Sequence, residues 1–99
     1  MNDDNFFAPV AFKPDEALAQ AKRALRDIRS LSERNNHFSL QGQVVLELTV
    51  VDKVLRARLA KRPARSPDWE LRDCKNSAEL RALQDEIKRR VARWTDETV

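Results

Sequence analysis

The stretch from Phe38 to Val50 constrains the fold of this chain most, because apolar residues occupy every even position in it except Gly42. The odd positions between them are polar, with Val45 as the exception. A period of two is the pattern of a β-strand that has one face on a core and the other in water. The sequence therefore predicts one long strand whose even-numbered side chains point inward.

A second alternation follows Asp52-Lys53 and predicts that the chain turns back as a β-hairpin. Its inward positions are Leu55, Ala57 and Leu59, set against Val54, Arg56 and Arg58. A helix over residues 44–61 would also place several apolar residues on one face. However, this stretch is rich in β-branched residues, which favour a strand.

Gly42 interrupts the inward row of the first strand. We interpret it as a bulge or bend that curls the strand over the helices. A two-residue turn at Gln41-Gly42 is the alternative. It would pair Leu40 with the polar Gln43 and break the parity of the run, so the sequence favours the bend.

Two amphipathic helices are predicted on either side of these strands. The first begins at Pro14-Asp15-Glu16, where proline and acidic residues suit a helix start, and ends at Asn35-Asn36, where asparagine can cap it. The last begins at Asn76 or Ser77, with Glu79 completing a capping box. Apolar stripes at helical spacing run along both: Ala17, Leu18, Ala21, Ala24, Leu25, Ile28 and Leu31 in the first, and Leu80, Leu83, Ile87, Val91 and Trp94 in the last.

Between the hairpin and the last helix, residues 61–67 read KRPARSP, and the two prolines predict a loop. Residues 68–75 then predict a third strand, with Trp69 and Leu71 inward and Glu70, Arg72 and Cys74 on the other face. The expected fold is α+β: a two-layer α-β-β-β-α domain whose three-stranded antiparallel sheet has both helices packed on one face. We expect an apolar arm at 1–12, a single domain at 13–95 and a frayed tail at 96–99.

This element order is shared with double-stranded RNA-binding domains. Such domains resemble one another in a lysine-rich start to the second helix. The corresponding stretch here is Asn76-Ser77-Ala78-Glu79, with only Lys75 before it. The sequence therefore does not assign the chain to that family, and element order alone does not determine function.

Composition narrows the class of protein. The 99 residues are 41% hydrophobic and 35% charged, as expected of one globular domain, and contain no apolar run of the ~20 residues that a membrane span needs. Asp3 and Asp4 stand where a signal peptide would be basic, and the single cysteine, Cys74, cannot form an internal disulfide. These features predict a cytoplasmic protein. Because Gly42 is the only glycine, no glycine-rich phosphate loop is expected, and no cofactor is predicted.

No catalytic or metal-binding residues are predicted. His37 is the only histidine and has no partner ligands near it in sequence. The paired acids, such as Asp85-Glu86, are expected on helix surfaces or at the terminus. Cys74 lies beside Lys75, but no base is placed to activate it. The sequence therefore argues against an enzyme.

The densest charge feature is a basic segment over residues 53–65, in a chain whose net charge is +3 and whose isoelectric point is near 9.4. Five of its residues form a candidate nucleic-acid site, on a strand that leads into a loop: Arg56, Arg58, Lys61, Arg62 and Arg65. The alternative is that Arg56 and Arg58 form ordinary cross-strand ion pairs with Glu47 and Glu70. A second basic cluster, Lys88, Arg89, Arg90 and Arg93, would strengthen the nucleic-acid hypothesis if it shared a face with the first.

The N-terminal arm holds Phe6, Phe7 and Phe12. Aromatic residues in such number are expected either to fold back over the core or to contact a partner, and Phe6 and Phe7 are the candidate partner-binding residues. The overall prediction is a small binding module that acts through a protein partner or self-association, using this arm, the open sheet face or an edge strand. Nucleic-acid binding through residues 53–65 is the alternative, and neither hypothesis involves a membrane or a metal.

Overall fold

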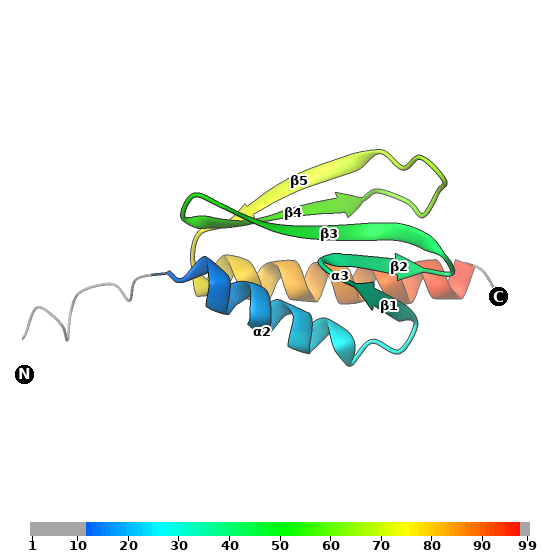
Figure 1. Cartoon of the computed structure of the whole chain (residues 1–99). Coiled ribbons are helices and arrows are strands. Elements are labelled where there is room, and N and C mark those ends of the chain that lie inside the picture. The colour runs from blue at the N-terminus through cyan, green and yellow to red at the C-terminus, as the bar shows by residue number, and fades with distance from the viewer. Residues whose placement is uncertain (1–11, 98–99) are drawn as a thin grey trace, which may run out of the picture.

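The sheet has five antiparallel strands, so the predicted three-stranded sheet is wrong, although the α+β class holds. In the computed structural model, which describes residues 12–97 of the chain, the strands follow one another across the sheet in chain order (Figure 1). They are β1 (Leu31–Arg34), β2 (His37–Leu40), β3 (Gln43–Val51), β4 (Val54–Ala60) and β5 (Trp69–Cys74). Phe6 and Phe7 lie outside the described residues.

The first helix, α2 (Pro14–Arg26), ends earlier than predicted. Ile28 and Leu31 continue its apolar spacing, but Leu31 instead begins β1 and lies opposite Leu40 of β2. Asn35 adopts a positive φ of 55°, the left-handed conformation expected of it, but in the β1–β2 turn rather than in a helix cap. Backbone pairing with β2 therefore overrides the helical pattern of this segment.

The predicted bend at Gly42 is also wrong, because Gln41-Gly42 forms a two-residue turn between β2 and β3. Both residues have positive φ, 53° and 83°, as tight hairpin turns require. Leu40 does pair with Gln43, but the register then shifts by one residue, so that Phe38 lies opposite Leu46. This β-bulge brings the apolar residues of β2 and β3 back to the same face of the sheet, and it leaves Val45 as the extra, buried residue.

The turn at Asp52-Lys53 is confirmed, since Val51 pairs with Val54 across it. The faces predicted for β5 are wrong, except that Trp69 is partly buried and packs against the core. Cys74 lies opposite the buried Leu55, whereas the side chain of Leu71 is 60% exposed. The charged Glu70 and Arg72 therefore lie on the side of the helices, and Leu71 lies on the side of water.

Both helices cover one face of the sheet, as predicted (Figure 1). The core between the layers includes Leu25 of α2, the β-strand residues Leu46, Leu48, Leu55 and Leu59, and the full predicted stripe of α3 (Ser77–Glu97). At the start of α3, the Glu79 N–H donates to Asn76 Oδ1 at 2.9 Å, and Glu79 Oε1 accepts from the Lys75 N–H at 2.7 Å. No helix in the described part of the chain is long and apolar enough to cross a membrane.

The β1–β2 hairpin makes the element order of this chain differ further from that of double-stranded RNA-binding domains. It places a four-residue strand, β1, between α2 and the first of the predicted strands. Within residues 12–97 the sheet is left with two edges, the short β1 and the longer β5, and with one face that neither described helix covers (Figure 1).

Candidate functional site

On the open face of the sheet, arginines of β4 form ion pairs with carboxylates on both neighbouring strands. Arg58 Nη1 donates to Glu47 Oε1 of β3 at 2.9 Å, and Arg56 Nε donates to Asp73 Oδ1 of β5 at 2.8 Å. Glu70, the partner expected on β5, lies on the other face, whereas Asp73 stands directly opposite Arg56. The hydrogen bond from Arg56 lowers the pKa of the Asp73 carboxyl. Two of the five candidate nucleic-acid residues are therefore held by carboxylates.

Arg58 makes a further contact with an aromatic ring. Its guanidinium carbon lies 4.6 Å from the centroid of Trp69, on β5. A guanidinium over an indole face is attracted by the electron-rich ring. Arg58 is thus fixed between Glu47 and Trp69, which limits its freedom to follow a phosphate backbone.

The other three candidate residues lie in the β4–β5 loop and are free of such pairs. Lys61, Arg62 and Arg65 are exposed, and none forms an ion pair with any residue of the described range 12–97. Beside them a hollow of about 340 Å³ opens between this loop and the β2–β3 turn. It is lined by Gly42, Gln43, Val44, Ala64, Arg65, Pro67 and Trp69. The structure thus divides the predicted basic site into a paired strand portion and an unpaired loop portion.

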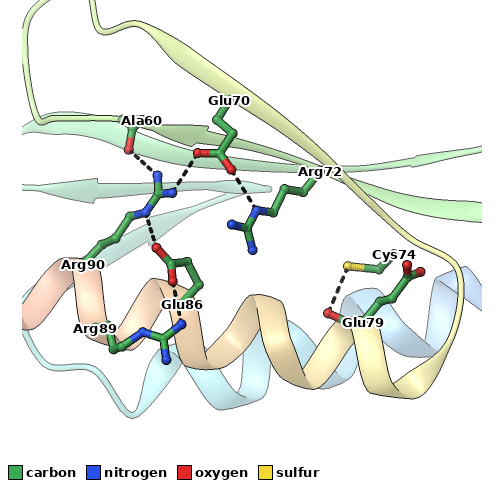
Figure 2. A network of polar contacts seen from close by, with 8 residues as sticks. All are labelled: Ala60, Glu70, Arg72, Cys74, Glu79, Glu86, Arg89 and Arg90. Atoms are coloured by element: carbon green, nitrogen blue, oxygen red, sulfur yellow. Dashed lines mark hydrogen bonds and ion pairs between the residues drawn. The ribbon is translucent and has the colours of Figure 1, made fainter.

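The second basic cluster is not a continuous surface, because Arg90 turns toward the sheet and is only 9% exposed. Figure 2 shows its guanidinium between three acceptors: Glu70 at 2.7 Å, Glu86 at 2.7 Å and the Ala60 carbonyl at 3.2 Å. Burial disfavours the charge of Arg90, but the hydrogen bonds to both carboxylates outweigh it and raise its pKa.

Glu70 links this network to the edge strand. Its second carboxylate oxygen accepts from Arg72 Nε at 2.9 Å, so one acid bridges two arginines on the helix-covered side of β5 (Figure 2). The hydrogen bonds from Arg90 and then Arg72 lower the pKa of Glu70. Sequence reasoning missed this network. The signal available was that Arg90 follows Ile87 by three residues and so falls within the inward stripe of α3.

The β5 edge has a further property that follows from the ladder it forms with β4. The Lys61 N–H donates to the Asp68 carbonyl at 2.9 Å, just beyond the paired strands. Hydrogen-bonded pairs alternate along an antiparallel ladder, and the β4–β5 register is regular. The backbone groups of Glu70, Arg72 and Cys74 therefore point to β4, and those of Trp69, Leu71 and Asp73 point to the free edge.

These outward groups have no partner within residues 12–97, because no backbone hydrogen bond from another described segment reaches them. Leu71 occupies the middle of this edge, and it is the large apolar residue that the described chain leaves exposed. An unpaired edge with an apolar centre is a template for another strand.

The remaining candidates are less suited to chemistry. His37 is exposed, and its Nε2 lies 3.9 Å from Glu47 Oε2. Cys74 is buried, its Sγ donates to the Glu79 carbonyl at 3.7 Å, and burial raises the pKa of its thiol, the reverse of an activated nucleophile. Among residues 12–97 no three histidine, cysteine or acidic side chains gather as a metal site.

Comparison of the chain with protein-family models, with curated proteins and with solved structures found no match.

Proposed function

We propose that this chain is a protein-binding module whose β5 edge accepts an extended strand from a protein partner. The observation that supports it is the row of outward backbone groups at Trp69, Leu71 and Asp73, which have no partner in the described chain. Adding a strand to a sheet edge satisfies such groups, and side chains on the added strand supply specificity. The proposal assigns no catalytic step to the chain.

The side chains of β5 define the partner chemistry. Leu71 would pack against an apolar side chain on the water side of the added strand, while Glu70 and Arg72 would face polar or charged side chains on the helix side. Charges at an edge also exclude strands that lack complementary groups. We place this binding in the cytoplasm, because the one cysteine, Cys74, is a free thiol.

Substitution at Leu71 tests this proposal. Affinity capture from the source cells, followed by chemical cross-linking, is carried out with the native chain, with Leu71→Lys and with Ala19→Lys. Ala19 is exposed on α2, so its variant carries the same added charge away from the sheet. We expect a partner protein that cross-links to β5, is retained by Ala19→Lys and is reduced about tenfold or more by Leu71→Lys. Equal capture by all three chains, or cross-links confined to other elements, would contradict the proposal.

A second candidate function is binding to the phosphate backbone of single-stranded nucleic acid through the β4–β5 loop. What supports it is that Lys61, Arg62 and Arg65 are exposed and unpaired within the described chain, beside a hollow lined by Trp69. A typical single-strand site combines cations that follow the phosphates with an aromatic ring on which a base stacks. Because Arg58 covers one face of the Trp69 ring, a base would have to use the other face or displace Arg58. Arg56 and Arg58 are not needed in this version of the site.

Salt dependence tests the second candidate. Three phosphate contacts on a single strand predict that affinity falls about 20-fold between about 50 mM and 200 mM salt. With Arg62→Glu and Arg65→Glu together, one contact remains, and the expected fall is about threefold. The control, Arg23→Glu with Arg81→Glu, changes the charge equally at two exposed helix positions. Fluorescence anisotropy of a labelled oligonucleotide measures each case, and an identical salt slope for both double variants would refute the assignment.

A further inference from the structure

We infer that the strand accepted by β5 is β5 of a second copy, so that two chains form one continuous ten-stranded sheet around a two-fold axis. This inference rests on the proposed function, since it names the partner of the same edge. It follows from three features of β5: the direction of its backbone groups, the order of its charges and the position of Leu71.

The backbone restricts how two β5 strands can pair. Only the residues with outward groups, Trp69, Leu71 and Asp73, can form hydrogen-bonded pairs across the new interface. In the antiparallel register with Leu71 opposite Leu71 of the second copy, Trp69 faces Asp73 of that copy on both sides of the axis. All three residues of each strand are then paired. A shift of two residues in either direction leaves one of the three without a partner.

The charges select the same register. With Leu71 on the axis, Glu70 stands opposite Arg72 of the second copy, and Arg72 opposite its Glu70. These positions are non-hydrogen-bonded pairs, where side chains of neighbouring strands approach most closely. The shifted registers would instead set Glu70 against a second Glu70, or Arg72 against a second Arg72, and like charges in direct opposition are destabilising.

The existing contacts are compatible with this arrangement. Arg72 Nε and Glu70 Oε2 already lie 2.9 Å apart within one chain, on the side that faces the helices. Two such pairs brought together make a cluster of four alternating charges. On the water side, the exposed Leu71 side chains of the two copies cover each other, which removes apolar surface from water. A self-complementary patch of this kind is what a two-fold interface requires.

Disulfide cross-linking tests the register. Leu71→Cys places the two new thiols at one hydrogen-bonded pair, where the Cα atoms are about 5.5 Å apart, within reach of a disulfide. In Trp69→Cys and in Asp73→Cys, the two equivalent thiols of the dimer lie four residues apart along the paired strands, a distance of roughly 13 Å. We expect mild oxidation to give covalent dimers of Leu71→Cys and not of the other two. The native chain, which carries only the buried Cys74, is the control.

Two measurements on unmodified chains test the interface itself. In sedimentation experiments we expect a concentration-dependent dimer whose dissociation constant rises about tenfold or more in Leu71→Lys and is unchanged in Ala19→Lys. In hydrogen exchange followed by NMR, the amides of Trp69, Leu71 and Asp73 should become protected as the dimer forms. Those of Glu70 and Arg72 should be protected at every concentration, because they already bond to β4.

Several results would overturn the inference. One is a chain that stays monomeric at millimolar concentration. Another is a dimer in which the outward amides still exchange rapidly, or a monomer in which they are already protected by another part of the same chain. Preferential cross-linking of Trp69→Cys or Asp73→Cys would contradict the register. If the chain proves monomeric but still captures a partner protein in a manner sensitive to Leu71→Lys, the proposed function stands and only the second copy is refuted.

Discussion

At the scale of single residues, Glu86 shows how two arginines together change the pKa of one carboxyl on a helix. It accepts hydrogen bonds from Arg89 Nη2 at 2.6 Å and from Arg90 Nε at 2.7 Å. Pairs at these helical spacings contribute only a few tenths of a kcal/mol on an exposed helix. Here Arg90 is buried, and the two hydrogen bonds, that from Arg89 first, lower the pKa of Glu86 from 4.5 to about 2.

This shift predicts an acid-sensitive contribution to stability. A carboxyl with a lower pKa in the folded state stabilises the fold above its unfolded pKa, and this contribution disappears as the pH falls through the folded pKa. The window for Glu86 therefore runs from about pH 4.5 down to about pH 2. We expect Glu86→Gln to lower the free energy of unfolding at pH 7 by about 1–2 kcal/mol, and we expect the difference from the native chain to shrink steadily below about pH 4.5 and to vanish below about pH 2. Urea unfolding followed by circular dichroism across this range measures the difference, and a constant offset at all pH values would contradict it.

At the scale of elements, the β2–β3 hairpin combines a tight turn with a compensating bulge. The turn places Gln41 at a φ of 53° and Gly42 at 83°, and the bulge at Val45 returns Phe38 and Leu46 to one face. Side chains at positive φ crowd the backbone, so glycine is favoured there and asparagine is the best-tolerated alternative. Gln41 therefore occupies a position that its side chain does not favour.

Two substitutions in this turn should act in opposite directions. A Cβ at Gly42 would meet no atom within 4 Å. Gly42→Ala should therefore lower the free energy of unfolding only through the strain of a side chain at positive φ, by about 1 kcal/mol. Gln41→Asn creates the Asn-Gly pair preferred in such turns and should raise the free energy of unfolding by about 0.5 kcal/mol. Thermal unfolding of both variants and of the native chain tests these two predictions. Stabilisation by Gly42→Ala would show that the turn does not have this geometry.

At the scale of the whole molecule, Arg90 joins the two layers. From α3 it reaches the carbonyl of Ala60 at the end of β4 and the carboxylate of Glu70 on β5 (Figure 2). It thereby holds the helix against the edge strand that carries the proposed interface. A buried charge such as that of Arg90 stabilises the fold only while all its partners remain, because a charged group left unpaired in a buried position destabilises the fold.

Removing Arg90 should therefore weaken the whole fold. We expect Arg90→Met to lower the free energy of unfolding by about 2–3 kcal/mol, less than a fully buried pair would cost, because Glu70 and Glu86 keep some contact with water. The control, Arg89→Met, removes an exposed neighbour and should cost about 0.5 kcal/mol. Denaturant unfolding compares the two, and equal losses would show that Arg90 has no special role in joining the layers.

The sequence by itself determined the features that depend on local spacing. The stripe of α3 from Leu80 to Trp94, the inward row of β4 and the turn at Asp52-Lys53 were all predictable, because a helix and a strand impose distinct periods on neighbouring residues. The prolines of the 61–67 loop likewise marked where pairing stops. The basic character of that loop was predictable too, since Lys61, Arg62 and Arg65 lie close together in the chain.

Only the tertiary structure decided which of two compatible patterns each remaining segment follows. Leu31 fits a helical stripe as well as a strand, and its pairing with Leu40 determines the outcome. The two-residue turn at Gln41-Gly42 is acceptable only because a bulge farther along β3 restores the register. Trp69 and Leu71 alternate with charged residues, but Arg90, from a helix distant in sequence, satisfies Glu70 on the inner side and thereby leaves Leu71 facing water at the edge. In each case a contact between distant residues outweighs a local preference worth a fraction of a kcal/mol.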